Sequence, residues 1–266
     1  MKILTTKTKA VTFAVMATLS MGLTAETQAA EGILQVKETV KSDYAKTKYP
    51  IVMTHGMFGF TRLGTSAFGM DYFYQVLPDL ARNGATVFAT QVSPLESTEV
   101  RGEQLLAQVE EIRALTGKNK VNLLGHSHGG PTVRYIAAIR PDIVASVTGV
   151  AGTFRGSKVA DDILVNQGTS TLANFFGGKL LAPIITWAEG NSSLPINTTA
   201  SLISISEKGS AQFNQKFPTA ALAANCNTSG ANLENGIRYY SWTGKAQITN
   251  ILDVLDSVIS QLAPLS

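Results

Sequence analysis

The chain is poor in the residues that most often build ligand clusters, because its 266 residues include one cysteine and three histidines. A single cysteine excludes a scaffold held together by several disulfides, and no group of cysteines and histidines has the spacing of a structural zinc site. Charged residues make up only 15% of the chain, and the absence of polar repeats argues against disorder. The length and the 44% hydrophobic content instead predict one globular domain with a large core.

Residues 1–30 have the pattern of a secretory signal peptide. Three lysines precede an uncharged, mostly apolar stretch from Ala10 to Ala25, and the small residues Ala29 and Ala30 are suited to cleavage. The apolar stretch is short for a membrane span. Without the three lysines and Glu26 of residues 1–30, the 22 basic and 19 acidic residues of the chain become 19 and 18, which leaves a net charge near +1. Because no basic run or nucleic-acid-binding motif is present, we do not expect nucleic acid as a partner.

Short apolar runs alternate with segments of helical periodicity. The clearest helix spans residues 99–116, where Leu105, Val109 and Ile112 share one face and Gly117 follows the end. Residues 31–48 are polar and are expected to form an N-terminal arm. The predicted strands are 51–54, 86–92, 121–124, 146–150, 202–205 and 239–242, and the other predicted helices are 72–82 and 131–139. This alternation predicts a single α/β domain over residues 31–266, with a mostly parallel sheet.

A wide apolar stripe with a Gly-Gly pair in its middle spans residues 169–187. One interpretation is a helix of the core. The other is a flap whose apolar underside faces a lipid surface. Periodicity alone does not distinguish the two.

The run Gly125-His126-Ser127-His128-Gly129 fits the pattern G-x-S-x-G and lies between a predicted strand and a predicted helix. In that context the serine is placed on a sharp, strained turn, and the glycines let strand and helix approach each other. The run His55-Gly56-Met57 ends an earlier predicted strand. We therefore predict Ser127 as a nucleophile, with the backbone N–H groups of Met57 and His128 forming an oxyanion hole.

Three longer strings contain these motifs: residues 49–60, 97–106 and 121–135. They resemble the foldase-dependent secreted triacylglycerol lipases of Gram-negative bacteria, the Pseudomonas–Burkholderia type, and the resemblance extends from about residue 48 to the C-terminus. It implies an α/β-hydrolase fold, hydrolysis of long-chain triacylglycerols at an oil–water interface, and a helical lid at about residues 169–187. It also implies a bound calcium ion, a membrane-tethered foldase, and secretion through the periplasm by the type II machinery.

Position by position, the resemblance makes Asp253 a calcium ligand and Cys226 one half of a disulfide. The family's triad aspartate and histidine are expected after Asp253, and neither is found in these 266 residues. The disulfide partner and the remaining calcium ligands are expected in the same region, so the chain looks truncated at its C-terminus. Phe154 also stands where many relatives carry histidine.

The three histidines, His55, His126 and His128, all lie within the two motifs, and none is expected to accept the proton of Ser127. Loss of a triad member costs several powers of ten in rate. The sequence therefore predicts a lipase by descent with little or no turnover. Two alternatives stay open: a catalytically incomplete relative that binds lipid or the foldase, and a thioesterase or other acyl hydrolase, which Ser127 fits equally well.

Overall fold

The computed structural model describes residues 32–64, 69–166, 193–225 and 228–244. The predicted signal peptide at 1–30, the predicted lid at 169–187, Cys226 and Asp253 lie outside these described residues. Within the described ranges, no helix is both long enough and apolar enough to cross a membrane.

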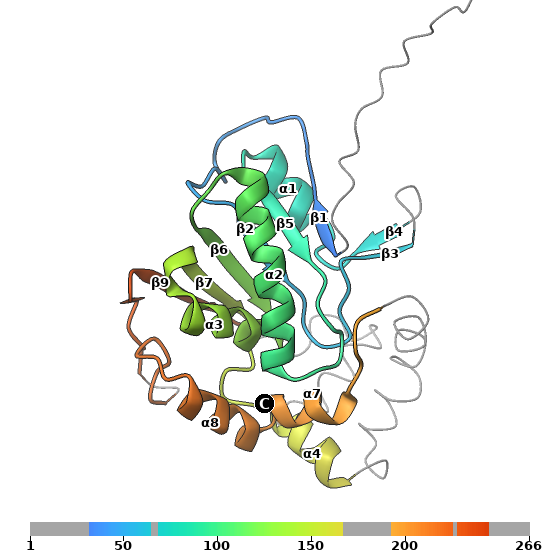
Figure 1. Ribbon diagram of the computed structural model, residues 1–266, viewed down its shortest axis with the longest axis vertical. Helices are drawn as coiled ribbons and strands as arrows, with labels where there is room; N and C mark the ends of the chain where they lie inside the picture. Colours follow the sequence, from blue (N-terminus) through green and yellow to red (C-terminus); the bar gives the residue numbers. More distant parts are fainter. Residues whose placement is uncertain (1–31, 65–68, 167–192, 226–227, 245–266) are drawn as a thin grey trace, which may run out of the picture.

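A seven-stranded sheet forms the centre of the fold, and its strand order is β1-β5-β2-β6-β7-β9-β8 (Figure 1). The inner strands from β5 to β9 run parallel, whereas the edge strands β1 and β8 pair antiparallel with their neighbours. In sheet order, the strands are β1 (Ile33–Gln35), β5 (Val87–Thr90), β2 (Ile51–Thr54), β6 (Val121–His126), β7 (Val144–Val150), β9 (Ile237–Trp242) and β8 (Leu233–Glu234). Strands β3 (Arg62–Gly64) and β4 (Gly69–Asp71) form a separate antiparallel pair.

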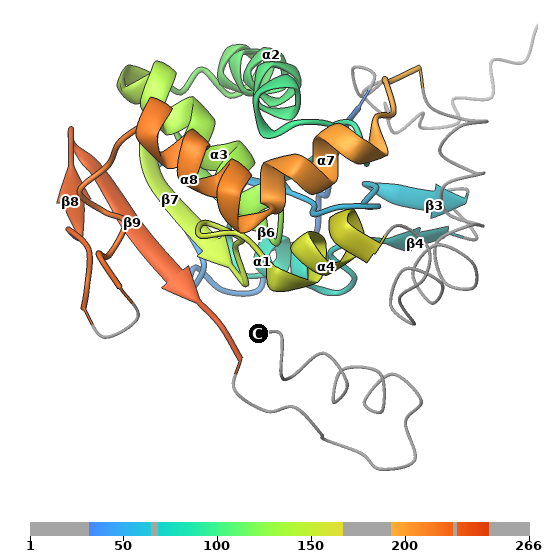
Figure 2. The ribbon, with the colours of Figure 1, turned by 90° about the horizontal axis from the view of Figure 1, so that it is seen from below.

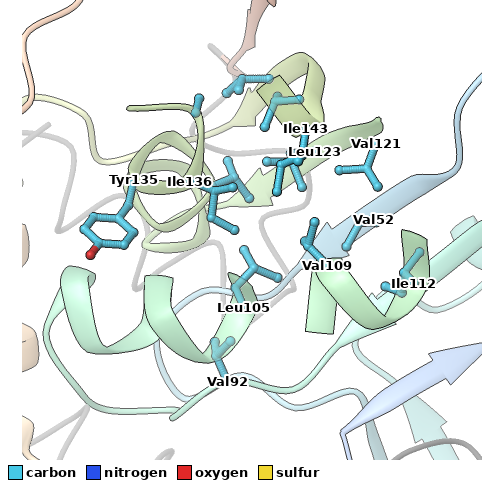
Figure 3. Packing of buried hydrophobic residues seen from close by; sticks show 14 of the residues in the cluster. Val52, Val92, Leu105, Val109, Ile112, Val121, Leu123, Tyr135, Ile136 and Ile143 are labelled. Atoms are coloured by element: carbon cyan, nitrogen blue, oxygen red, sulfur yellow. The ribbon is translucent and has the colours of Figure 1, made fainter. Parts of the chain in front are cut away.

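Helices flank both faces of this sheet. They are α1 (Val76–Arg82), α2 (Thr98–Thr116), α3 (Gly129–Ile139), the 3₁₀ turn η1 (Pro141–Ile143), α4 (Lys158–Asn166), α7 (Thr198–Ile205) and α8 (Glu207–Lys216). Adjacent residues of β2 point to opposite sides, so that Val52 packs with residues of α2 and α3 while Met53 packs with residues of α1. Figure 2 shows α2 and α3 on the side of the sheet opposite α1. The larger of the two cores lies beneath α2 and α3, where Leu105, Val109 and Ile136 meet the sheet (Figure 3).

The predicted α/β class and mostly parallel sheet are confirmed, and the strands expected at 51–54, 121–124 and 239–242 are present. The strand predicted at 202–205 is wrong, because these residues end helix α7. The side chain of Asn197 caps this helix by accepting the Ala200 N–H at 2.9 Å. The apolar residues that suggested a strand therefore belong to a helix, in which Ile205 is buried and Ile203 is exposed.

The N-terminal arm is also more ordered than its polar composition indicated. Ile33 pairs with Thr90, so that β1 adds an antiparallel strand to the edge of β5. The helix expected from residue 72 begins only at Val76, and Tyr72 lies in the preceding turn, where its side chain reaches the candidate site.

Candidate active site

Ser127 lies on the turn that joins β6 to α3, at the carboxyl edge of the sheet. Its φ angle is 55°, in the left-handed region that side-chain-bearing residues rarely adopt. A Cβ atom at Gly125 would lie 2.1 Å from the carbonyl oxygen of Gly129, so only glycine lets the strand and the helix start come this close. The strained turn expected from the motif is therefore present, and it directs Ser127 out of the core at the sheet edge.

The loop that follows β2 lies directly against this turn. A Cβ atom at Gly56 would be 2.8 Å from Ser127 Cβ and 3.2 Å from Ser127 Oγ. Among the described residues, neither the Met57 N–H nor the His128 N–H donates a hydrogen bond. Within the described part of the chain, the N–H groups that follow Gly56 and Ser127 are therefore unpaired, which is the arrangement that can stabilise an oxyanion.

A buried arginine of helix α2 holds this loop through hydrogen bonds to its backbone. The guanidinium of Arg101 on α2 donates to the carbonyl oxygens of His55 at 2.6 Å, Gly56 at 3.4 Å and Ser93. The C=O and N–H groups of a trans peptide point in opposite directions. Since the Gly56 carbonyl points toward the guanidinium, the N–H of Met57 points away from it. Burial lowers the pKa of Arg101 to about 9, which still leaves the side chain charged at neutral pH.

His55 is fully buried and serves the same loop. Its Nδ1 lies 2.8 Å from the Gly56 carbonyl oxygen, and its Nε2 accepts the Val92 N–H at 3.3 Å. This pattern assigns the proton of the neutral ring to Nδ1. Burial, together with the charge of Arg101, lowers the pKa of His55 to about 3. The ring is therefore a neutral structural group at the pH values where esterases work.

His126, the residue before the nucleophile, is linked to the loop through Tyr72. Its Nδ1 lies 2.6 Å from Tyr72 Oη, and Tyr72 Oη accepts the Gly56 N–H at 3.2 Å. Since Tyr72 Oη accepts that bond, its own proton is free to go to the imidazole. Burial lowers the pKa of His126.

His128 is inaccessible to solvent. Its Nε2 lies 2.9 Å from Thr98 Oγ1 at the start of α2, and its Nδ1 lies 3.5 Å from Ser201 Oγ on α7. Burial lowers the pKa of His128 well below its ordinary value, and the charge of Arg101 acts in the same direction.

The structure therefore brings Ser127 together with Met57 and His128, but it does not supply a base from the described residues. Each of the three imidazoles is engaged by other groups, and none of them bonds to Ser127 Oγ. Phe154 packs its ring against the end of β7, where a Cβ atom at Gly149 would lie 2.4 Å away. Among the described residues, no cluster of His, Cys, Asp or Glu could hold a metal ion.

Sequence reasoning missed Arg101 and Tyr72. A signal for the arginine was present, because Arg101 precedes Leu105 by four residues and so lies on the face of α2 that also carries Ile112. An arginine on an otherwise buried face indicates an internal binding partner. Nothing in the sequence around Tyr72 indicated its contact with the loop.

Comparison with known proteins places these features in a wider group. The profile described as alpha/beta hydrolase fold matches residues 49–252. A triacylglycerol lipase of Vibrio cholerae serotype O1 is 47% identical over 216 residues, which cover 80% of this chain and 68% of that protein. A triacylglycerol lipase of Pseudomonas fragi is 34% identical over 226 residues, covering 82% and 75%. The mature form of the Bacillus licheniformis lipase BlEst2 has a similar fold, with a TM-score of 0.59 at 19% identity, over 87% of this chain and 79% of that one.

Proposed function

The chain belongs to the α/β-hydrolase family and, within it, to the triacylglycerol lipases, and from this membership we propose that it acts on carboxylic esters through Ser127. The observation that carries the proposal is the placement of Ser127 on its strained turn, next to the N–H groups of Met57 and His128, which donate to no described residue. Such a constellation serves acyl transfer, because the two donors face the oxygen that becomes negative when the carbonyl carbon is attacked.

In the proposed reaction, Ser127 Oγ forms a bond to the ester carbonyl carbon while its proton passes to water. The carbon–oxygen bond to the alcohol then breaks, and the alcohol leaves with a proton from water. A second water molecule cleaves the acyl-serine, which releases the fatty acid and restores the hydroxyl. The Met57 and His128 N–H groups bind the carbonyl oxygen in both tetrahedral states, and Arg101 and Tyr72 hold the loop that carries Met57.

The proposed substrate is a triacylglycerol, as the names of the relatives indicate. Its long acyl chains and its position at an oil–water interface rest on the sequence resemblance. Export through the periplasm rests on the pattern of residues 1–30. The lid at 169–187, the foldase, type II secretion and a calcium ion bound with Asp253 rest on the sequence resemblance. They remain parts of the proposal.

We also propose that these 266 residues alone turn esters over slowly. All three histidines of the chain lie in the described part, and each is held by contacts that keep it from Ser127 Oγ. Without a base, an oxyanion hole and substrate binding still leave a rate about 10³–10⁴-fold above that in water. The expected activity is therefore small but dependent on Ser127.

The test is hydrolysis of p-nitrophenyl butyrate and p-nitrophenyl palmitate by the full chain, with and without added imidazole as an external base. We expect slow hydrolysis that rises with imidazole and that Ser127→Ala abolishes. Ser42→Ala, which changes an exposed serine bonded to Asn83, is the matched control and should behave as the wild type.

Unchanged hydrolysis in Ser127→Ala would show that Ser127 is not the nucleophile. Fast hydrolysis that depends on Ser127 and ignores imidazole would support the serine but contradict the slow turnover. Faster cleavage of an acyl thioester than of the matching oxygen ester would contradict the ester assignment.

A further inference from the structure

Helix α7 contacts the turn of the nucleophile through the hydroxyl of Ser201 and the start of α2 through the hydroxyl of Ser204. Ser201 and Ser204 are three residues apart and so share one face of the helix. Ser201 Oγ lies 3.5 Å from His128 Nδ1, and Ser204 Oγ accepts the Thr98 N–H at 3.2 Å. The helix is held at both ends, since Asn197 N–H donates to Leu95 O at 2.6 Å and Ile205 O accepts the Ser157 N–H at 2.8 Å. Its position relative to the turn is therefore well defined.

The imidazole of His128 bridges α7 and α2. Its second nitrogen lies 2.9 Å from Thr98 Oγ1, and Thr98 is also the residue that Ser204 contacts. The backbone of His128 is fixed as well, because its carbonyl oxygen accepts Thr132 Oγ1 at 2.8 Å, and that hydroxyl accepts Arg101 Nε at 3.3 Å. His128, Thr98 and Ser201 are all buried, so water does not replace these bonds.

We propose that Ser201 and the imidazole of His128 are positioning residues, which aim the His128 N–H at the oxyanion and so make the oxyanion hole depend on the docking of α7. This inference rests on the proposed function, since it assigns a role to groups behind the same site. The physical reason is the angle of the hydrogen bond that the His128 N–H donates. A hydrogen bond weakens steeply as its angle falls, and a side chain anchored at both nitrogens resists rotation of its own backbone.

The experiment measures labelling of Ser127 by a p-nitrophenyl alkylphosphonate, in the full chain and with imidazole in every sample. Ser127 Oγ forms a bond to phosphorus, p-nitrophenolate leaves, and the serine proton passes to the added imidazole. The phosphoryl oxygen then lies where the oxyanion would lie. The matching thiophosphonate places sulfur there, which accepts hydrogen bonds poorly. The ratio of the two labelling rates therefore reports the oxyanion hole itself.

We expect Ser201→Ala to lower this oxygen-to-sulfur ratio about threefold and His128→Ala to lower it about tenfold, less than the 10²–10³-fold cost of losing a donor outright. His128→Gln keeps a hydrogen-bonding group in the same place and should recover most of the ratio. Ile203→Ala is the matched control, because this side chain of the same helix is 47% exposed. It should leave the ratio unchanged.

Equal losses with both analogues would overturn the inference, because a purely structural role lowers both rates by the same factor. An unchanged ratio in Ser201→Ala would overturn it too, and this variant keeps the test decisive where His128→Ala fails to fold. Wild-type protein that is labelled no faster than Ser127→Ala would instead overturn the proposed function. Wild-type labelling with the same ratio in all variants overturns only the role of α7.

Discussion

The space between the sheet and helices α2 and α3 has two ends of different composition. At the end where α2 begins, the buried groups are polar and include Arg101, His55 and His128. Toward the other end of α2 they are apolar, with Val109 and Ile112 packed against Val121 (Figure 3). Arg101 and Ile112 are equally inaccessible to solvent, so exposure does not distinguish the two ends.

The difference lies in what burial contributes. Each large apolar side chain contributes about 1.5–3 kcal/mol to stability when it is buried. A buried charge costs free energy that its hydrogen bonds only offset, so the polar end stabilises the fold little. What the polar end provides is geometry, because its bonds fix the carbonyls of His55 and Gly56 and the imidazole of His128.

The largest effect is expected for Arg101→Met, which leaves the carbonyl oxygens of His55 and Ser93 without this donor. Each unsatisfied buried acceptor costs about 1–3 kcal/mol, so we expect a loss of about 3 kcal/mol or more, measured by urea unfolding. Phosphonate labelling of Ser127 in the folded protein should also slow. Leu105→Ala, at the apolar end, is the control. It should lose about 2–5 kcal/mol and label at the wild-type rate. Labelling of Arg101→Met at the wild-type rate would contradict the claim that the buried polar groups fix the geometry of the loop.

Acidification should lower the free energy of unfolding through the buried histidines of the polar end. Native His55 has a pKa of about 3, whereas the unfolded side chain takes up its proton near pH 6.5. Between these values the unfolded state binds more protons, so stability falls as the pH falls. The contribution of His55 to the slope approaches about 1.4 kcal/mol per pH unit, or about 2 kcal/mol between pH 6.5 and 5, and His128 adds to the slope in the same direction. Urea midpoints across this range test it. His55→Gln should flatten the curve, and an identical slope in that variant would contradict the assignment.

A smaller effect is expected at the nucleophile. Ser127→Gly removes a side chain from a residue with φ of 55°, which should stabilise the fold by about 1 kcal/mol while ending all labelling. Asn235→Gly, at φ of 51° in the turn before β9, is the matched control and should gain less, because asparagine tolerates this conformation. A less stable Ser127→Gly protein would show that the turn is not strained.

The smallest effect is expected for Lys216→Ala. Lys216 pairs with Glu99 at 3.3 Å, but its side chain is 63% exposed. Such pairs contribute about 0–1 kcal/mol, and we expect a loss below about 0.5 kcal/mol, measured by urea unfolding with and without added salt. A loss above 1 kcal/mol would contradict the view that an exposed ion pair contributes far less than a buried charge such as Arg101.

Local pattern was enough to predict the elements that contain a short apolar run or a clear helical period. Strands β2 and β6 are short apolar runs, and α2 shows its period and its terminal Gly117. Pattern failed at α7, because its apolar residues are compatible with either a strand or a helix. The cap at Asn197 and the docking of Ser201 and Ser204 decide for the helix, and the docking depends on residues 73 and 106 positions away.

The sequence by itself determined that Ser127 lies between glycines on a turn from strand to helix, since the spacing of that motif and its flanking runs are local properties. Only the tertiary structure decided what surrounds it. Gly56 and Ser127 meet because β2 and β6 are neighbours in the sheet, and Arg101 reaches the loop because α2 packs over that edge. The roles of the three histidines followed from the same packing, because the partners and pKa of a buried imidazole depend on which groups the fold places around it.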